Sequence, residues 1–165
     1  MLNLRRAHPS LARNTPRFME IIGTVTNLLR EKKETHLWSI SPDATVYAAI
    51  ELMADKNIGA VPVVQEGRLL GMLSERDYTR NVILKGKSSK NSLVREIMST
   101  DPTTVSPDES LGECMRLMTD KRVRHLPVVQ NGELVGILSI GDLVKWIISS
   151  QTAAIEQLTK YIFGE

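Results

Sequence analysis

The chain has 165 residues, 42% of them hydrophobic, and a formal net charge of +2. This size and composition suffice for one compact domain with its own core. A single cysteine excludes an internal disulfide, and three histidines without a Cys-x-x-Cys pair give no zinc motif, so we expect a reducing compartment. No apolar run reaches the ~18 residues of a membrane-spanning helix, and no hydrophobic leader follows the first methionine. The composition therefore favours a cytoplasmic protein.

The positive charge is concentrated at the start of the chain. Residues 1–19 contain four arginines and no acidic residue, so the remainder has a net charge of −2. A domain that binds nucleic acid normally has a dense basic face, so only this arm favours nucleic acid as a partner. We interpret residues 1–19 as a flexible basic arm. An arginine-rich start is also typical of a transit peptide, which would place the protein in an organelle matrix, and Met19 is an alternative start.

The rest of the chain contains an internal repeat. Residues 41–77 and 106–142 align without a gap at an offset of 65 residues, so that Ser74, for example, aligns with Ser139. A solenoid needs about three copies, so two copies should instead pack against each other as a pseudo-twofold pair. We therefore divide the chain into a leading helix (20–35), a first motif (36–84), a linker (85–95), a second motif (96–150) and a C-terminal helical extension (151–165).

Each motif is predicted to run β-α-β-β-α, which makes the fold α/β (α+β). The segment with Leu37, Trp38 and Ile40 is predicted to be a short strand that ends at Ser41-Pro42-Asp43, where the proline starts a helix. The second motif repeats this pattern around Ser106-Pro107-Asp108.

The later elements also agree between the two copies. Apolar residues recur at helical spacing from position 46 and from position 111. Hairpins are predicted around Gln65-Glu66-Gly67 and Gln130-Asn131-Gly132, followed by helices at 78–84 and 143–149. An apolar stripe continues through Ile148, Ile155, Leu158 and Ile162, which predicts a longer last helix that needs a partner surface.

A Ser-x-x-Asp motif follows each hairpin, from Ser74 to Asp77 and from Ser139 to Asp142. Alone, this pattern predicts a capping box, in which the two side chains satisfy backbone amides at a helix start. Its repetition at the same distance from a Pro-Val-Val strand indicates that the same corner is built twice, close to the pair axis.

These motifs resemble those of the CBS-domain family, in which two motifs form a CBS pair that binds adenosyl ligands. The resemblance covers roughly residues 36–150. It implies that adenine lies between apolar strands and the backbone before the proline, while serine and aspartate hold the ribose. The implied ligand-binding residues are Ala60, Val61, Pro62, Ser74, Arg76, Asp77, Arg124, His125, Leu126, Pro127, Ser139, Gly141 and Asp142.

The implied ligand is an adenine nucleotide, with AMP first and ADP, ATP, NAD or S-adenosylmethionine as alternatives. Phosphates need positive charge, for which Arg76, Arg124 and His125 are candidates. Because glycine and alanine replace Arg124 and His125 in the first motif, the two clefts should be unequal. We predict that the cleft with Asp77 and Arg76 binds a phosphorylated nucleotide more tightly than the cleft with Asp142.

The resemblance implies a non-catalytic regulatory module that senses the nucleotide and passes its state to a partner protein in trans. Homodimers are common in the family, and the apolar stripe after Ile148 agrees with one. Three alternatives stay open: a ligand-free interaction scaffold, a nucleotide-processing enzyme using Glu75, Asp77 and His125, and nucleic-acid binding through the arm.

Two other motifs are rejected as sites. Gly86-Lys87-Ser88 resembles the end of a phosphate-binding P-loop, but that pattern requires glycine where Asn81 stands. The segment 85–90 is better interpreted as solvated linker. Cys114 aligns with Ala49 on the apolar stripe, which predicts a small core residue and not a nucleophile.

Overall fold

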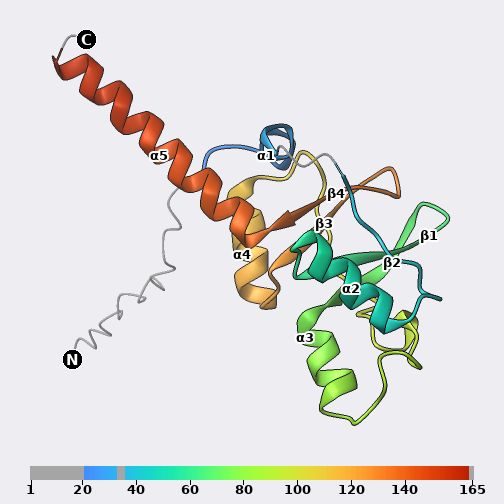
Figure 1. Ribbon diagram of the computed structural model, residues 1–165. Helices are drawn as coiled ribbons and strands as arrows, with labels where there is room; N and C mark the ends of the chain where they lie inside the picture. Colours follow the sequence, from blue (N-terminus) through green and yellow to red (C-terminus); the bar gives the residue numbers. More distant parts are fainter. Residues whose placement is uncertain (1–20, 33–35, 164–165) are drawn as a thin grey trace, which may run out of the picture.

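The computed structural model describes residues 21–32 and 36–163. Two similar halves lie side by side, each with a two-stranded antiparallel hairpin and a helix packed against it (Figure 1). The helices are α1 (Val25–Glu31), α2 (Val46–Lys56), α3 (Glu75–Tyr78), α4 (Leu111–Lys121) and α5 (Ile140–Phe163). The strands are β1 (Ala60–Gln65), β2 (Arg68–Ser74), β3 (His125–Gln130) and β4 (Glu133–Ser139). The predicted mixed fold of two tandem motifs is confirmed.

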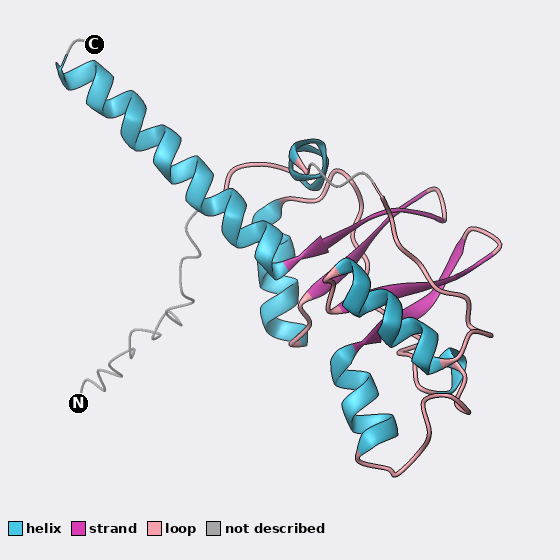
Figure 2. Ribbon diagram, viewed as in Figure 1, coloured by secondary structure: helices cyan, strands magenta, loops and turns pink. Residues whose placement is uncertain are grey.

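The two hairpins, drawn as pairs of magenta arrows in Figure 2, have the same register. Ala60 faces Ser74 in the first hairpin, and His125 faces Ser139 in the second. Both central turn residues have positive φ, as in Glu66-Gly67 with φ of 51° and 76°. This conformation matches the strand twist and favours the Asn131-Gly132 sequence of the second turn, whereas in the first turn only Gly67 is of a type that adopts it readily. Each hairpin therefore brings the start of its first strand to the end of its second.

The predicted short strand at Leu37–Ile40 is wrong, because only Ile40 pairs with β1. Its N–H donates to Pro62 O and its carbonyl accepts from Val64 N–H, both at 3.0 Å. A parallel ladder would next need N–H donors from Pro62 and from Pro42, which have none. The prolines therefore limit pairing to one residue, and Val105 in the second motif is limited in the same way.

The main helices begin later than predicted. Ser41, Pro42 and Asp43 form a turn, closed by a 3.1 Å bond from Ala44 N–H to Ser41 O, and do not start α2. Thr45 caps the helix instead, because its side chain accepts from Ala48 N–H. Ser110 has the same role for α4.

The leading helix is shorter than predicted, since α1 extends only from Val25 to Glu31. Gly23 has φ of +127°, which is not helical, and Thr24 forms a capping box with Asn27. The helix packs on the second half: Leu28 joins its core, and the Trp146 indole donates a 2.9 Å bond to Ile22 O. The predicted arm at 1–19 lies outside the described residues.

The second helix of the first motif also differs from its prediction at 78–84. It starts at Glu75, as the four-residue α3, and continues as a π-helical segment from Thr79 to Ile83. The chain is then largely exposed from Lys85 to Lys90. The predicted linker ends earlier than expected, because Val94 is fully buried in the first core.

The two halves have separate hydrophobic cores. The first contains Val46, Met53, Val61 and Leu73, and the second contains the corresponding residues Leu111, Met118, Leu126 and Leu138. Cys114 is fully buried in the second core, as predicted. Burial raises the pKa of its thiol to about 12, so the group stays protonated.

Gly71 and Gly112 test how closely the chain is packed around each glycine. A methyl group on Gly71 would collide with the carbonyl oxygen of Ser99, which belongs to the chain that pairs with β2, whereas Gly112 in α4 faces open space. We expect Gly71→Ala to lower the free energy of unfolding by about 1–3 kcal/mol. Gly112→Ala should raise it by up to ~1 kcal/mol, because alanine favours a helix. Urea unfolding of both variants checks this, and equal effects would contradict the packing.

Candidate functional site

The Ser-x-x-Asp motifs form two equivalent corners. Ser74 N–H donates to Asp77 Oδ2 at 2.9 Å, the Ser74 hydroxyl donates to the same oxygen, and Asp77 N–H donates to Ser74 Oγ at 3.2 Å. Ser139 and Asp142 repeat all three bonds. The capping boxes are thus complete. In each aspartate these bonds use only Oδ2, and among the described residues no donor reaches Oδ1.

The first cleft, of about 380 Å³, lies at the Asp77 corner. Its lining includes Ala60 at the start of β1, Ser74 at the end of β2, and Arg76 and Asp77 just after it, all predicted site residues. Arg124 and His125 enter from the second motif, so one cleft combines predicted residues from both halves.

Four arginines line this cleft: Arg76 and Arg80 from the helix after β2, and Arg122 and Arg124 from the chain that leads into β3. Within the described ranges none of the four has an ion-pair partner. Glu75 and Asp77 are the only acidic residues of the lining, so the cleft has a surplus of positive charge.

Arg80 and Arg122 were missed by the sequence analysis. Arg80 follows Asp77 by three residues, so one turn of helix brings both side chains to the cleft. This spacing from the Ser-x-x-Asp motif is the one feature of the sequence that could have identified Arg80. Arg122 ends α4 with φ of +54°. Its place in the cleft of the other motif depends on the packing of the halves, and no local pattern gives it.

The second cleft, of about 490 Å³, lies at the Asp142 corner. It contains the predicted residues Ser139 and Asp142 and shares Ala60 and His125 with the first cleft. Its aromatic side comes from the chain before Ile40, where the rings of His36 and Trp38 stack with centroids 5.5 Å apart.

Lys32, at the end of α1, occupies the Asp142 corner. Its Nζ lies 2.8 Å from Asp142 Oδ2 and donates to Ile137 O at 3.1 Å. The carboxylate is only 14% exposed, so this ion pair is well shielded. Burial would raise the pKa of Asp142, but Lys32 and the bonds from Ser139 outweigh it and hold the pKa below its usual 3.8. Asp77 has no such partner among the described residues.

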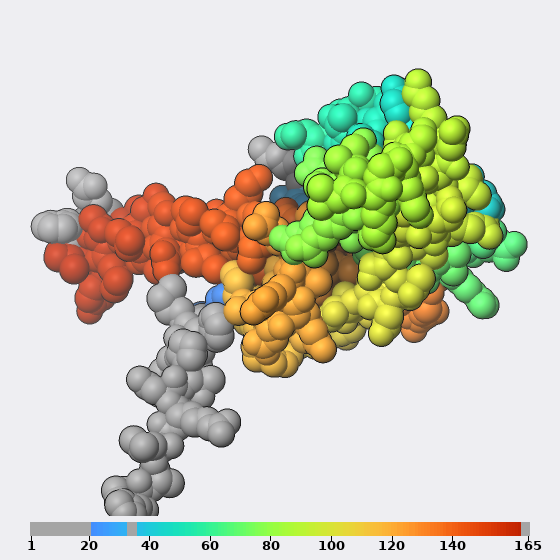
Figure 3. Space-filling view, turned by 90° about the horizontal axis from the view of Figure 1, so that it is seen from below, coloured from blue at the N-terminus to red at the C-terminus, as the bar shows by residue number. Residues whose placement is uncertain are grey.

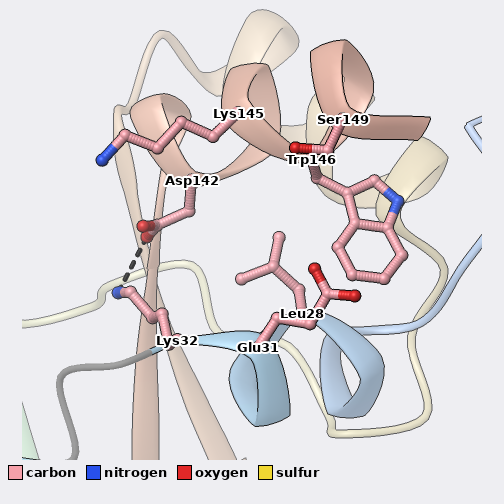
Figure 4. Close-up of a pocket in the computed structure, with 7 residues that line it drawn as sticks. All are labelled: Leu28, Glu31, Lys32, Asp142, Lys145, Trp146 and Ser149. Carbon is pink, nitrogen blue, oxygen red and sulfur yellow. Dashed lines mark ion pairs between the residues drawn. The ribbon is translucent and has the colours of Figure 1, made fainter. Parts of the chain in front are cut away.

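Figure 4 shows the ion pair at the edge of a third cavity, of about 400 Å³, between α1 and α5. Leu28 and Trp146 supply its apolar surface, and Lys145 lies beside Asp142. Lys32 and Asp142 line both this cavity and the second cleft. The ion pair therefore stands between the two spaces.

The remaining predicted residues do not line either cleft. Val61 and Leu126 are fully buried in the two cores, and Pro62 and Pro127 are buried beside them. Gly141 is exposed in the first turn of α5. The lysines of segment 85–90 also lie outside both clefts.

Comparison with known proteins shows the family. The CBS-domain family model matches residues 33–83 and 94–149. The chain belongs to the CBS-domain family.

Its relatives within the family come from several lineages. The mitochondrial CBS domain-containing protein CBSX3 of Arabidopsis thaliana is 36% identical over 150 residues, which cover 86% of this chain and 72% of CBSX3. YhcV of Bacillus subtilis is 35% identical over 76% of this chain and 89% of its own. A solved CBS-domain structure from Burkholderia ambifaria is 45% identical, with a TM-score of 0.75 over 78% of this chain and 96% of its own. CBS-domain proteins are typically regulatory, and membership of the family therefore assigns this chain to the general class of regulatory modules.

His125, which lies between the two clefts, makes stability depend on pH. Burial lowers the pKa of this histidine below 6.5. Between the lowered pKa and 6.5 the unfolded chain binds the proton and the folded chain does not, so folding weakens as the pH falls below 6.5. We expect the melting temperature to drop between pH 7.5 and 5.5 and expect His125→Gln to reduce this drop. The stability that the lowered pKa of Asp142 contributes is lost only below pH 3.8, outside this range. A drop in melting temperature as large in His125→Gln as in the native chain would therefore contradict the assignment to His125.

Proposed function

We propose that the first cleft binds an adenine nucleotide, with AMP as the foremost candidate. The observation that carries this proposal is the convergence of Arg76, Arg80, Arg122 and Arg124 on the cleft that also holds the Ser74–Asp77 corner. Asp77 Oδ1 accepts no bond from the part of the chain that the structure describes, so it can accept bonds from ribose hydroxyls, and the guanidinium groups suit a phosphate. Ala60 and His125 offer the backbone before each proline to the adenine.

The surplus of positive charge favours phosphorylated ligands. AMP, ADP, ATP and NAD have negative charge that the arginines can neutralise. S-adenosylmethionine has a sulfonium cation, which the four guanidinium groups would repel. We therefore rank it last among the adenosyl ligands.

The two clefts differ in what a ligand must displace. Asp77 is free of ion pairs among the described residues, whereas the ribose of a ligand at Asp142 has to compete with Lys32. This difference supports the prediction that the first cleft binds a nucleotide more tightly than the second. The sequence supported that prediction through Arg76, and the structure adds the competition from Lys32 at the second cleft.

The module acts in this proposal without catalysis, by passing the ligand state to a partner protein in trans. A ligand shifts the packing of the two halves only by its differential affinity for their arrangements. The first cleft is built from both halves, so a bound nucleotide would contact both. We propose a homodimer as the working unit; CBS-CP12 proteins with 26% identity are described as hexameric.

For the compartment, we propose the cytoplasm. The mitochondrial CBSX3 supports the organelle alternative. Within the described ranges, no helix has the length and apolar character needed to cross a membrane.

The Asp77 and Asp142 corners give a direct test of nucleotide binding. We expect AMP at 100 times its dissociation constant to stabilise the native chain by about 2.7 kcal/mol and raise its melting temperature by several degrees. Asp77→Ala should abolish most of this shift and Asp142→Ala little of it. Both substitutions remove a capping box, and Asp142→Ala also removes the ion pair with Lys32, so the stability of each variant without ligand is measured first and the shift is taken relative to it.

Arg80 separates binding from helix capping, because it takes no part in the capping box. Arg80→Gln should weaken AMP binding about tenfold in calorimetry, by loss of a charge-assisted contact with phosphate. Arg68→Gln, an exposed arginine outside both clefts, is the matched control. No shift with AMP, ADP, ATP, NAD or S-adenosylmethionine would overturn the proposal and favour the ligand-free scaffold. Slow conversion of a bound nucleotide would favour the enzyme.

Lys32 is expected to suppress binding at the second cleft. In the Asp77→Ala background, which isolates that cleft, Lys32→Met should increase AMP affinity several-fold, because Asp142 no longer has a competing cation. Arg30→Met, on the exposed side of the same helix, should have no such effect. Calorimetric titration of both double variants checks this. Weaker binding after Lys32→Met would show that the lysine assists the ligand.

A further inference from the structure

The last part of α5 projects from the body of the protein as a bare helix (Figures 1 and 3). The 24-residue helix begins in the second core, where Leu143 is fully buried, but every residue described from Ser149 to Ile162 is exposed. Ile155, Leu158 and Ile162 are each more than 60% exposed. An isolated helix of about a dozen residues is marginal in water, so this segment needs a surface that covers its apolar face.

The apolar face follows a heptad pattern. Its positions alternate by four and three residues: Val144, Ile148, Gln151, Ile155, Leu158 and Ile162. This 3.5-residue period keeps one seam facing a partner helix and is typical of a coiled coil, in which the seam positions are called a and d. The pattern extends over a little less than three heptads, all on α5.

We propose that α5 forms a parallel two-stranded coiled coil with α5 of a second copy of this chain. Ile148, Ile155 and Ile162 occupy a, and Leu158 occupies d. β-Branched residues at a with leucine at d favour two parallel strands over higher oligomers.

The flanking charges permit pairing of identical copies. From Thr152 onward the e and g positions, which face each other across a coiled coil, are Thr152, Ala154, Thr159 and Tyr161. None is charged, so two copies would meet without like-charge repulsion. Glu156 and Lys160 lie on the outer positions b and f, away from the seam.

Gln151 sets the direction. In a parallel, in-register pair this d residue faces its own copy, and two amides can hydrogen-bond to each other. In the antiparallel pairing that superimposes the seam on itself, Gln151 would face Ile155, and an amide buried against an alkyl chain is unfavourable. A single polar layer of this kind fixes register in coiled coils.

This interface is independent of the nucleotide clefts. It involves neither Asp77 nor Lys32, and it starts where α5 leaves the second core. It gives the homodimer predicted from the sequence one geometry, in which the CBS motifs of both copies lie at the same end of the coiled coil.

Disulfide trapping in the full chain tests the proposal. In a parallel coil, Gln151→Cys places two thiols within disulfide distance, whereas Ala153→Cys, at the outward position f, does not. We expect oxidation to yield covalent dimer at least about tenfold faster for Gln151→Cys. The native Cys114 is buried and stays as the common background. Equal rates would overturn the coil. Faster linkage of a Gln151→Cys and Ile155→Cys mixture than of Gln151→Cys alone would overturn the parallel direction.

A second pair of variants tests association without a disulfide. Ile155→Asp places a charge in the seam and should weaken self-association at least about tenfold by sedimentation equilibrium, while Ala153→Asp should not. Circular dichroism confirms that both variants are folded. Unchanged association in Ile155→Asp would overturn the proposal and leave this face to a different protein.

Discussion

The register of the two hairpins is the constraint on which both clefts depend. Because Ala60 faces Ser74 and His125 faces Ser139, the backbone before each proline lies beside the corresponding Ser-x-x-Asp corner. A shift by one residue would turn every side chain of the strand to the other face and separate these groups. The Glu66-Gly67 and Asn131-Gly132 turns set the pairing next to them, and a β-bulge at Val63/Val64 and at Val128/Val129 then shifts the register. The site at the corners therefore depends on both the turn and the bulge of each hairpin.

Duplication makes the halves alike, but their neighbours make them different. Gly71 accommodates the chain at Ser99, while the equivalent Gly136 accommodates Leu29 of α1. The same helix brings Lys32 to Asp142. Asp77 instead lines a cleft that arginines from both motifs also line. One inherited corner has thus become open and basic, and the other is closed by an internal cation.

Much of this arrangement could be predicted from the sequence, because it depends on local sequence patterns that occur in both motifs. The hairpins, the capping boxes and the continuation of the last helix are of this kind. The short strand before Ser41 could also have been excluded, since Pro42 and Pro62 remove the donors on both sides of Ile40. By contrast, the contact of Lys32 with Asp142 joins residues from opposite ends of the folded part, and Arg122 reaches a cleft of the other motif. Such contacts depend on how the halves pack, which periodicity does not encode.

The end of α4 has a consequence for how the chain trades stability against binding. Arg122 adopts the left-handed conformation, with φ of +54°, which is unfavourable for a long side chain. The equivalent residue of the first motif is Asn57, with φ of +52°, a residue type that tolerates this conformation well. A chain selected for stability alone would have asparagine or glycine at both helix ends. Arginine at one of them places a positive charge in the lining of the first cleft, at the expense of a more stable helix terminus.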